Sequence, residues 1–371
     1  MQDTPSTSMP PRAGLHYRRV TPDFALRTQG ARKVLVLLFG GLGDVVHSFP
    51  ALWSIRRTYP QAQLHVLVAG NYSSLLELLP WLDGRLGYQT RKSGLTRNEL
   101  AYVWKLRRTG YDVTINLTGN NHGSVLAFAS GARWRIGRRP YWDRKKGWRL
   151  LQTGVMDFRY EQEPMYRQWL ECLAQAGFPD DAEFRIEIPA GALAASGIEA
   201  ADAGRYIHVS PCTTDDARQL PVAQMIELLE GLHARLPQHR LVLSAMRSDR
   251  ERLRMDAILG GLSFQPWKVF RGELNVVELC AVIRDAALHL SGDTGPLHLA
   301  WMLNTASVSW FRIKHDNLEY LPPPPRHRAL MAESPVPDAL VGIPTQALCD
   351  AAVELVTTID AAQPLVQVVR R

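Results

Sequence analysis

Residues 293–300 read Asp-Thr-Gly-Pro-Leu-His-Leu-Ala and follow an apolar run of the chain. An apolar run, a glycine turn and a helical spacing of apolar residues predict a buried strand that turns into a helix. The first turn of such a helix offers free backbone N–H groups and a partial positive charge, both of which favour a phosphate group. Asp293, Thr294 and His298 add a carboxylate, a hydroxyl and an imidazole around Gly295. A plain helix cap by Asp293 or Thr294 explains the same pattern equally well.

A second pattern of strand, glycine turn and helix lies near the N-terminus. The run Lys33–Phe39 is apolar after its first residue, as in a strand buried on both faces of a parallel sheet. The spacing of the glycines that follow is not GxGxxG, so it does not support a dinucleotide fingerprint, but Gly41 and Gly43 let the backbone approach a ligand closely. Asp44 begins the following helix and serves either as a helix cap or as a functional carboxylate.

Strand and helix patterns alternate along the whole chain of 371 residues. This alternation predicts an α/β protein with two Rossmann-like, doubly wound domains. Further strands are expected at 63–68, 110–117, 205–210 and 240–244, and helices at 222–236, 249–259, 278–283 and 346–357. The expected divisions are a tail over 1–30, an N-terminal domain over 31–190, a C-terminal domain over 200–345, and a final helix and tail over 346–371.

Composition narrows the class of protein. Lys and Arg exceed Asp and Glu by 43 to 36, which favours an anionic partner. The four cysteines are widely separated and lack metal-ligand spacing, as expected for a reducing cytoplasm without a structural zinc or a disulfide framework. The sequence has neither an apolar run long enough to span a bilayer nor an apolar N-terminal signal core, so we expect a cytoplasmic location.

The segment 133–149 is strongly basic and is interleaved with aromatic residues. Such a pattern is typical of a nucleic-acid surface, of a site for an acidic glycolipid at a membrane, or of a solvated loop. The cations that we consider for an acidic acceptor are Arg135, Arg138, Arg139 and Lys145.

Two glycine-turn sites on two facing domains suit a reaction between a nucleotide-linked donor and a separate acceptor. Thr213, Thr214 and Arg218, together with the helix after Gly295, are able to hold a pyrophosphate and to stabilise it as it leaves. Asp44 is able to take the proton from an acceptor hydroxyl. The chain contains neither a P-loop motif nor a GxSxG motif, and no DxD-like carboxylate pair indicates a bound divalent cation.

Four blocks of sequence resemble one known family. They are Gly41–Asp44 with residues 49–52, residues 111–120 with 130–137, residues 213–221, and residues 293–300. In this order they resemble glycosyltransferase family 9, the bacterial ADP-heptose:lipopolysaccharide heptosyltransferases. The resemblance spans residues 33–312.

This resemblance implies a GT-B fold and an inverting, metal-independent transfer of heptose from ADP-heptose to the inner core of lipopolysaccharide at the inner membrane's cytoplasmic face. Asp44 would be the general base, and Arg218 would contact the donor phosphates and offset the leaving charge. The other expected donor contacts are Gly41, Gly43, Thr213, Thr214, Asp293, Thr294, Gly295 and His298, with Leu274 near the adenine and Glu251 near the nucleoside.

The chain departs from the family pattern at two places. Arg218 stands where the family more often has Lys, and Phe311-Arg312-Ile313 replaces the usual Gly-Pro-Thr after the last strand. These departures leave open another nucleotide sugar, a protein acceptor, or a nucleotide-sugar binder without catalysis. We expect no cofactor, no metal and no nucleic-acid partner, and a monomer that associates peripherally with the membrane.

Overall fold

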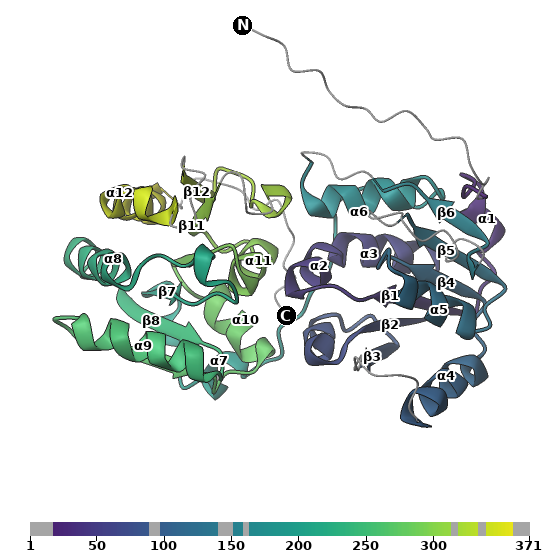
Figure 1. The fold of residues 1–371 in the computed structure, drawn as a ribbon, viewed down its shortest axis with the longest axis horizontal. Helices are drawn as coiled ribbons and strands as arrows, with labels where there is room; N and C mark the ends of the chain where they lie inside the picture. Colours follow the sequence, from purple (N-terminus) through teal and green to yellow (C-terminus); the bar gives the residue numbers. More distant parts are fainter. Residues whose placement is uncertain are drawn as a thin grey trace, which may run out of the picture.

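The computed structural model describes residues 18–88, 97–139, 151–158, 163–312, 318–332 and 339–358. The described chain forms two domains side by side, each built on a six-stranded parallel sheet (Figure 1). The predicted α/β class and the two doubly wound domains are therefore confirmed.

The N-terminal sheet has the strand order β3-β2-β1-β4-β5-β6. The inner strand β1 (Lys33–Leu38) is buried along its whole length after Lys33, because all of its other side chains are aliphatic. The direction of winding reverses between β1 and β4, and the edge beyond the carboxyl ends of such strands is where open α/β sheets bind ligands. The strands are β1 (Lys33–Leu38), β2 (Gln63–Ala69), β3 (Gly84–Tyr88), β4 (Val113–Asn116), β5 (Trp134–Arg138) and β6 (Gly154–Met156).

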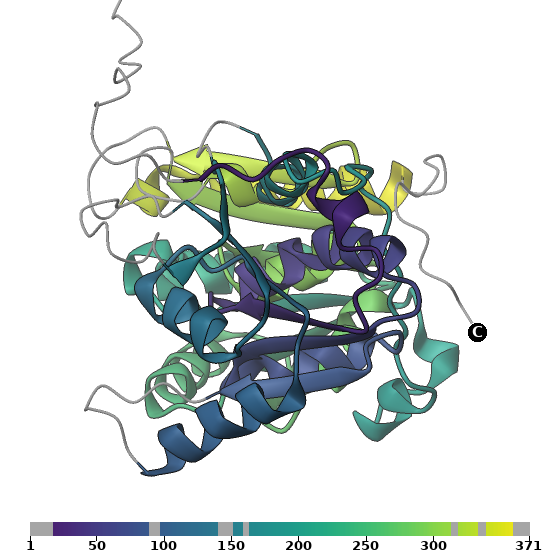
Figure 2. The ribbon, with the colours of Figure 1, turned by 90° about the vertical axis from the view of Figure 1, so that its right-hand side faces the viewer.

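Helices cover both faces of this sheet, as Figure 2 shows from the side of the N-terminal domain. One face packs against α1 (Phe24–Arg27), α2 (Leu42–His47), α3 (Phe49–Thr58) and α6 (Met165–Ala174), with η1 (Gly70–Leu78) beside them. The other face packs against α4 (Arg97–Thr109) and α5 (Asn121–Ala129). The helical pattern after Asp44 divides into α2 and α3 at Ser48, where Pro50 occupies the first turn of α3 and lacks an N–H group.

The expected N-terminal tail is shorter than residues 1–30. Phe24 and Ala25 are buried in the core, and the backbone N–H of Val20 donates to the carbonyl of Val155. These residues belong to the N-terminal domain because the apolar side chains of α1 cover Trp134 and Phe178. Residues 1–17 lie outside the described residues.

The C-terminal sheet repeats the first architecture, with the order β12-β11-β10-β7-β8-β9. Its strands are β7 (Tyr206–Ser210), β8 (Arg240–Ala245), β9 (Lys268–Arg271), β10 (Leu288–Gly292), β11 (Ser307–Arg312) and β12 (His327–Ala332). Its helices are α7 (Ala192–Ala195), α8 (Val222–Arg235), α9 (Asp249–Gly261), α10 (Val276–Arg284), α11 (Gly295–Met302) and α12 (Thr345–Thr358). Short 3₁₀ turns are η3 (Ala200–Asp202), η4 (Asp216–Arg218), η5 (Leu318–Tyr320) and η6 (Ala339–Gly342).

Two expectations about the C-terminal half change. Phe311 and Arg312 are the last residues of β11 and are buried, rather than following the strand, and Ile313 lies outside the described residues. The helix α12 packs against α8 and β11, so it belongs to the C-terminal domain rather than to a separate tail.

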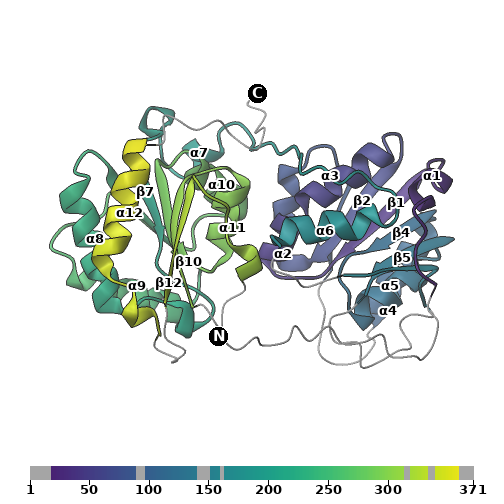
Figure 3. The same cartoon turned by 90° about the horizontal axis from the view of Figure 1, so that it is seen from above.

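The two domains share one apolar core at their junction. Leu299, Trp301 and Met302 of α11 belong to the same buried cluster as Val46 and Phe49 of the N-terminal domain. Figure 3 shows α2 and α11 next to each other where the domains meet. This contact brings the two glycine turns of the sequence into one place.

Candidate active site

The carboxylate of Asp44 lies in the first turn of α2, at the carboxyl edge of β1. The backbone N–H of Gly41 donates to its Oδ2 at 2.8 Å, and the hydroxyl of Tyr320 donates to its Oδ1 at 2.8 Å. A side chain at Gly40 would overlap this carboxylate, which explains a glycine at that position. Because Tyr320 belongs to η5, both domains hold the Asp44 carboxylate.

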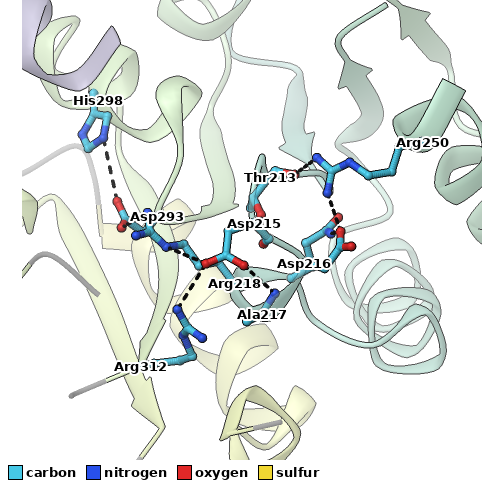
Figure 4. A network of polar contacts seen from close by, with 10 residues as sticks. Thr213, Asp215, Asp216, Ala217, Arg218, Arg250, Asp293, His298 and Arg312 are labelled. Carbon is cyan, nitrogen blue, oxygen red and sulfur yellow. Dashed lines mark hydrogen bonds and ion pairs between the residues drawn. The ribbon is translucent and has the colours of Figure 1, made fainter. Parts of the chain in front are cut away.

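Thr213, Thr214 and Arg218, which we expect to contact phosphate, lie in the loop between β7 and α8; we call this loop the phosphate loop. Thr213 is buried, and its hydroxyl donates to the carbonyl of Asp215 at 2.5 Å, whereas Thr214 is exposed. Nη1 of Arg218 donates to Oδ2 of Asp293 at 2.8 Å, and its Nε lies 3.6 Å from a carboxylate oxygen of Asp215 (Figure 4). The guanidinium of Arg218 thus stands between two carboxylates at the carboxyl ends of β7 and β10.

The buried carboxylate of Asp293 ends β10, and α11 begins directly after it. Asp293 pairs with Arg218 and lies one residue before the N-cap position of α11. Thr294 occupies the N-cap position with an extended backbone, and among the described residues its hydroxyl caps no helical N–H group. The start of α11 therefore presents backbone donors, one hydroxyl and a nearby cation, which suits a phosphate.

The imidazole of His298 lies one turn into α11, with Nε2 3.8 Å from Oδ1 of Asp293. Burial and the nearby Arg218 cation lower the pKa of His298 to about 4, so the ring is neutral at pH 7. The backbone of Gly43 packs closely against the His298 ring, because a Cβ at Gly43 would lie 2.8 Å from that ring. Gly295 in turn faces Leu42, which its Cβ would meet at 3.3 Å.

Three side chains at the junction were not identified from the sequence. Nε2 of His47 lies 3.3 Å from Nδ1 of His298, and the His47 ring stacks on Trp301 with centroids 4.3 Å apart. Tyr320 packs edge-on against His47, with centroids 5.1 Å apart. Burial lowers the pKa of His47 well below its usual value, with His298 as a smaller cause. The only local signal was that His47 follows Asp44 by one helical turn.

The residues that we expect near the nucleoside are Glu251 and Leu274, both in the C-terminal domain. Glu251 is buried at the start of α9 and accepts the backbone N–H of Met246 at 2.7 Å, so its carboxylate shapes the loop after β8. Arg250 donates to Asp216 and to the carbonyl of Thr213. Leu274, between β9 and α10, is partly buried against the apolar cluster around Tyr206.

A cavity of about 340 Å³ lies beneath the phosphate loop, between α8, α9 and η6, with Glu251 and Arg254 among its lining residues. Nε of Arg254 donates to the carbonyl of Pro211 at 3.0 Å, so α9 supports the phosphate loop from behind.

The structure separates the cations expected at the acceptor. Arg138 ends β5 at the carboxyl edge of the sheet and Arg139 follows it; Arg138 donates to the carbonyl of Thr118 at 3.1 Å, and Arg139 lies 3.9 Å from Asp157. Arg135 lies at the opposite end of the strand, and its guanidinium donates to the carbonyls of Leu151 and Ala132. Lys145 lies outside the described residues.

Two further observations concern the described residues alone. They contain no group of three or more His, Cys, Asp or Glu side chains arranged to hold a metal ion. Within the described ranges, no helix is long and apolar enough to cross a bilayer.

Comparisons with known proteins identify the family of this chain. The model of glycosyltransferase family 9 (heptosyltransferase) matches residues 100–333, more than half of the chain. The chain is 24% identical over 311 residues to the lipopolysaccharide core heptosyltransferase OpsX of Haemophilus influenzae, covering 80% of this chain and 83% of that protein. Identity below a quarter leaves substrate choice to be argued from the site.

Two solved structures show the same fold. Escherichia coli ADP-heptose lipopolysaccharide heptosyltransferase II matches with a TM-score of 0.71 at 18% identity, over 89% of this chain and all of that one (100%). Escherichia coli heptosyltransferase WaaC with ADP-2-deoxy-2-fluoro heptose matches with a TM-score of 0.68 at 18% identity, over 87% and 99% of the two chains. The chain therefore belongs to glycosyltransferase family 9, the heptosyltransferases, and is a glycosyltransferase of the GT-B fold.

Proposed function

We propose that the protein transfers heptose from ADP-heptose to the inner core of lipopolysaccharide, with inversion at the anomeric carbon and without a metal ion. One observation carries this proposal: α2, which begins with Asp44 in its first turn, packs against α11, whose first turn we expect to bind the donor phosphates. Family membership and a related structure with an ADP-heptose analogue support the choice of donor.

Asp44 acts as the general base. Its carboxylate accepts the proton of an acceptor hydroxyl while that oxygen attacks the anomeric carbon from the face opposite the diphosphate. Positive charge builds on the sugar ring as the bond to ADP breaks, as in other glycosyl transfers. The two donors already on Asp44, from Gly41 and Tyr320, fix the direction of its remaining lone pairs.

The leaving diphosphate is stabilised by the C-terminal domain. The Arg218 guanidinium, the backbone N–H groups at the start of α11 and the hydroxyls of Thr213, Thr214 and Thr294 face the developing charge. Because a permanent cation and a helix terminus are already in place, no divalent ion is needed for this step. His298, neutral at pH 7, provides a hydrogen bond to the donor without adding charge.

The acceptor approaches from the N-terminal domain, where Arg138 and Arg139 lie at the carboxyl edge of the sheet. Cations at this edge suit the phosphates and acidic sugars of an inner-core acceptor. Because that acceptor is a glycolipid, we place the enzyme in the cytoplasm, acting at the inner membrane's surface.

The test is ADP release from ADP-heptose, with and without an inner-core oligosaccharide, in wild type and Asp44→Asn. We expect acceptor-dependent release that persists in EDTA and falls at least about 100-fold in the variant, the usual scale for loss of a general base. Asp249→Asn is the matched control, because Asp249 also lies in the first turn of a helix but its side chain is 94% exposed.

Each part of the proposal has its own contrary result. Turnover with another nucleotide sugar in place of ADP-heptose would overturn the donor, and restoration of EDTA-treated enzyme by Mg²⁺ would overturn metal independence. Donor binding without turnover on any acceptor would indicate a binding protein.

A further inference from the structure

The outer surfaces of α4 and α5 expose large apolar side chains on the N-terminal domain. Leu100 and Trp104 lie one turn apart on α4 and are 55% and 60% exposed. Val125 and Phe128 lie one turn apart on α5 and are 52% and 51% exposed. We call these four side chains the α4–α5 face.

The two helices are neighbours on one side of the sheet. Their inward residues, including Leu106 and Leu126, share one buried cluster with β1. The C-terminal ends of the helices are level, because a Cβ at Gly131, just after α5, would lie 3.3 Å from the Arg107 guanidinium of α4. Trp104 and Phe128 lie a few residues before these ends, and Leu100 and Val125 lie one turn earlier on the same two neighbouring helices, so we treat the four side chains as one surface.

Cations lie beside the Trp104 and Phe128 end of this face. The guanidinium of Arg108 lies 4.3 Å from the centre of the Trp104 ring, and that of Arg135 lies 5.4 Å from the centre of the Phe128 ring. Lys105, Arg107 and Arg133 are exposed nearby. From the start of α4, residues 97–139 contain eight Lys and Arg residues and two carboxylates, Glu99 and Asp112, of which Asp112 accepts backbone N–H groups of Arg32 and Lys33.

We propose that the α4–α5 face docks on the anionic phospholipid surface of a bilayer, an inference that rests on the proposed glycolipid acceptor. Trp104 and Phe128 insert between the lipid headgroups, Leu100 and Val125 contact the outer part of the acyl chains, and the nearby cations contact lipid phosphates. The acceptor cations Arg138 and Arg139 belong to the same domain, so docking brings this domain to the acceptor's own membrane.

Charge and side-chain chemistry favour this occupant over two others. A second copy of the chain, docked by the same face, would bring two sets of cations together and would be repelled. A nucleic acid would contact the arginines and the aromatic rings, but the exposed Leu100 and Val125 offer nothing to bases or phosphates. An anionic bilayer provides a partner both for the apolar side chains and for the cations beside them.

The experiment is co-sedimentation of the full chain with sucrose-loaded vesicles of phosphatidylcholine alone and with added phosphatidylglycerol. We expect binding to anionic vesicles that weakens with salt, and a partition coefficient at least about tenfold lower for Trp104→Ser/Phe128→Ser. The matched control is Leu26→Ser/Leu253→Ser, which removes two equally exposed apolar side chains elsewhere and should bind as wild type does. Arg107→Gln/Arg108→Gln should lose about fivefold per cation.

A second readout, the tryptophan emission on vesicle binding, does not depend on the stability of the serine variant. Trp104→Phe keeps an apolar ring, so it should still bind vesicles but lose part of the blue shift in tryptophan emission that wild type shows on binding. An unchanged blue shift in this variant would contradict insertion of Trp104.

Further outcomes separate docking from catalysis. Trp104→Ser/Phe128→Ser should turn over a soluble oligosaccharide acceptor as wild type does, while slowing on the same acceptor anchored in vesicles. Failure of all turnover, with vesicle binding intact, would defeat the proposed function but not the docking surface. Equal binding to neutral and anionic vesicles, or binding to RNA or to itself instead of vesicles, would overturn the docking proposal.

Discussion

The hydroxyl of Tyr320 lies 2.8 Å from Oδ1 of Asp44, so a side chain of the C-terminal domain holds the carboxylate that begins α2 in the N-terminal domain. The contact joins residues 276 positions apart in the sequence. It makes the orientation of the proposed base depend on the position of the C-terminal domain, which we propose binds the donor.

Removal of this hydroxyl should affect turnover more than donor binding. In Tyr320→Phe the ring still packs against His47 and His298, but Asp44 loses one of its two donors. We expect kcat to fall by about tenfold, the scale of one hydrogen bond to a charged group, with the KM for donor nearly unchanged. Steady-state kinetics check this, and a change in donor KM with constant kcat would contradict a positioning role for Tyr320.

Arg218 should matter for both stability and donor binding. Arg218→Gln leaves the carboxylate of Asp293, which is 3% exposed, without its cation, and we expect a loss of about 3 kcal/mol in the free energy of unfolding. The KM for donor should also rise. Arg218→Lys should be less harmful than Arg218→Gln, because lysine keeps the positive charge but lacks the planar fork of donors that arginine presents to a carboxylate or phosphate. Urea unfolding and kinetics measure these effects. Arg252→Gln, which removes an exposed arginine of α9, is the control, and equal losses in both variants would argue against the Asp293 pair.

Gly43 should be required for the α2–α11 contact. In Gly43→Ala the new Cβ would lie 2.8 Å from the His298 ring, so the helices must separate or the ring must move. We expect destabilisation of about 1–3 kcal/mol and a loss of activity. Gly260→Ala is the control, because Gly260 lies within α9 with open space around it, and alanine there should be neutral or slightly stabilising. An unaltered melting temperature in Gly43→Ala would show that the junction is looser than the structure indicates.

Stability should decline on mild acidification because buried histidines are kept neutral. Burial lowers the pKa of His327 from 6.5 to about 4, with Arg326 as a smaller cause, and the pKa of His298 is likewise about 4. Between pH 6.5 and pH 4 the unfolded chain therefore binds more protons than the folded chain. The stabilisation is complete above the unfolded pKa and is lost as the pH falls toward the folded value.

The measurement is the free energy of unfolding from pH 7.5 to 4.5 for wild type and His327→Gln. Wild type should lose stability as the pH falls below about 6.5, and the variant should show a shallower slope there because it lacks one of the histidines that resist protonation. His327 accepts or donates one hydrogen bond with Ser307 at 2.8 Å, which glutamine can replace in part. Parallel pH profiles for the two proteins would refute the assignment of acid sensitivity to His327.

Most strands next to a glycine turn were predictable from the sequence. The expected strand at 63–68 corresponds to β2 (Gln63–Ala69), and the expected helix at 222–236 corresponds to α8 (Val222–Arg235). The strands β3, β5 and β9 were not predicted, because none of them shows a continuous buried apolar run. The residues of α4 and α5 likewise gave no local signal for an exposed apolar surface.

The residues of the candidate site were likewise only partly predictable from the sequence. Asp44, Arg218, Asp293 and His298 stood out because each lies beside a glycine turn or in a polar loop after a buried strand, and the structure brings Arg218, Asp293 and His298 together. Arg135 stood out for its charge alone, and the structure places it at the other end of its strand with backbone partners.

The sequence by itself determined two Rossmann-like halves and their two glycine turns, because runs of buried residues and turn glycines act over a few neighbouring positions. Only the tertiary structure decided that Tyr320 and His47 lie beside Asp44 and His298 and that Arg135 lies at the far end of its strand. Those assignments depend on how α2 packs against α11, which brings together residues 251 and 276 positions apart. Contacts at such separations follow from the complementary shapes of whole helices, and no local pattern of residue types records them.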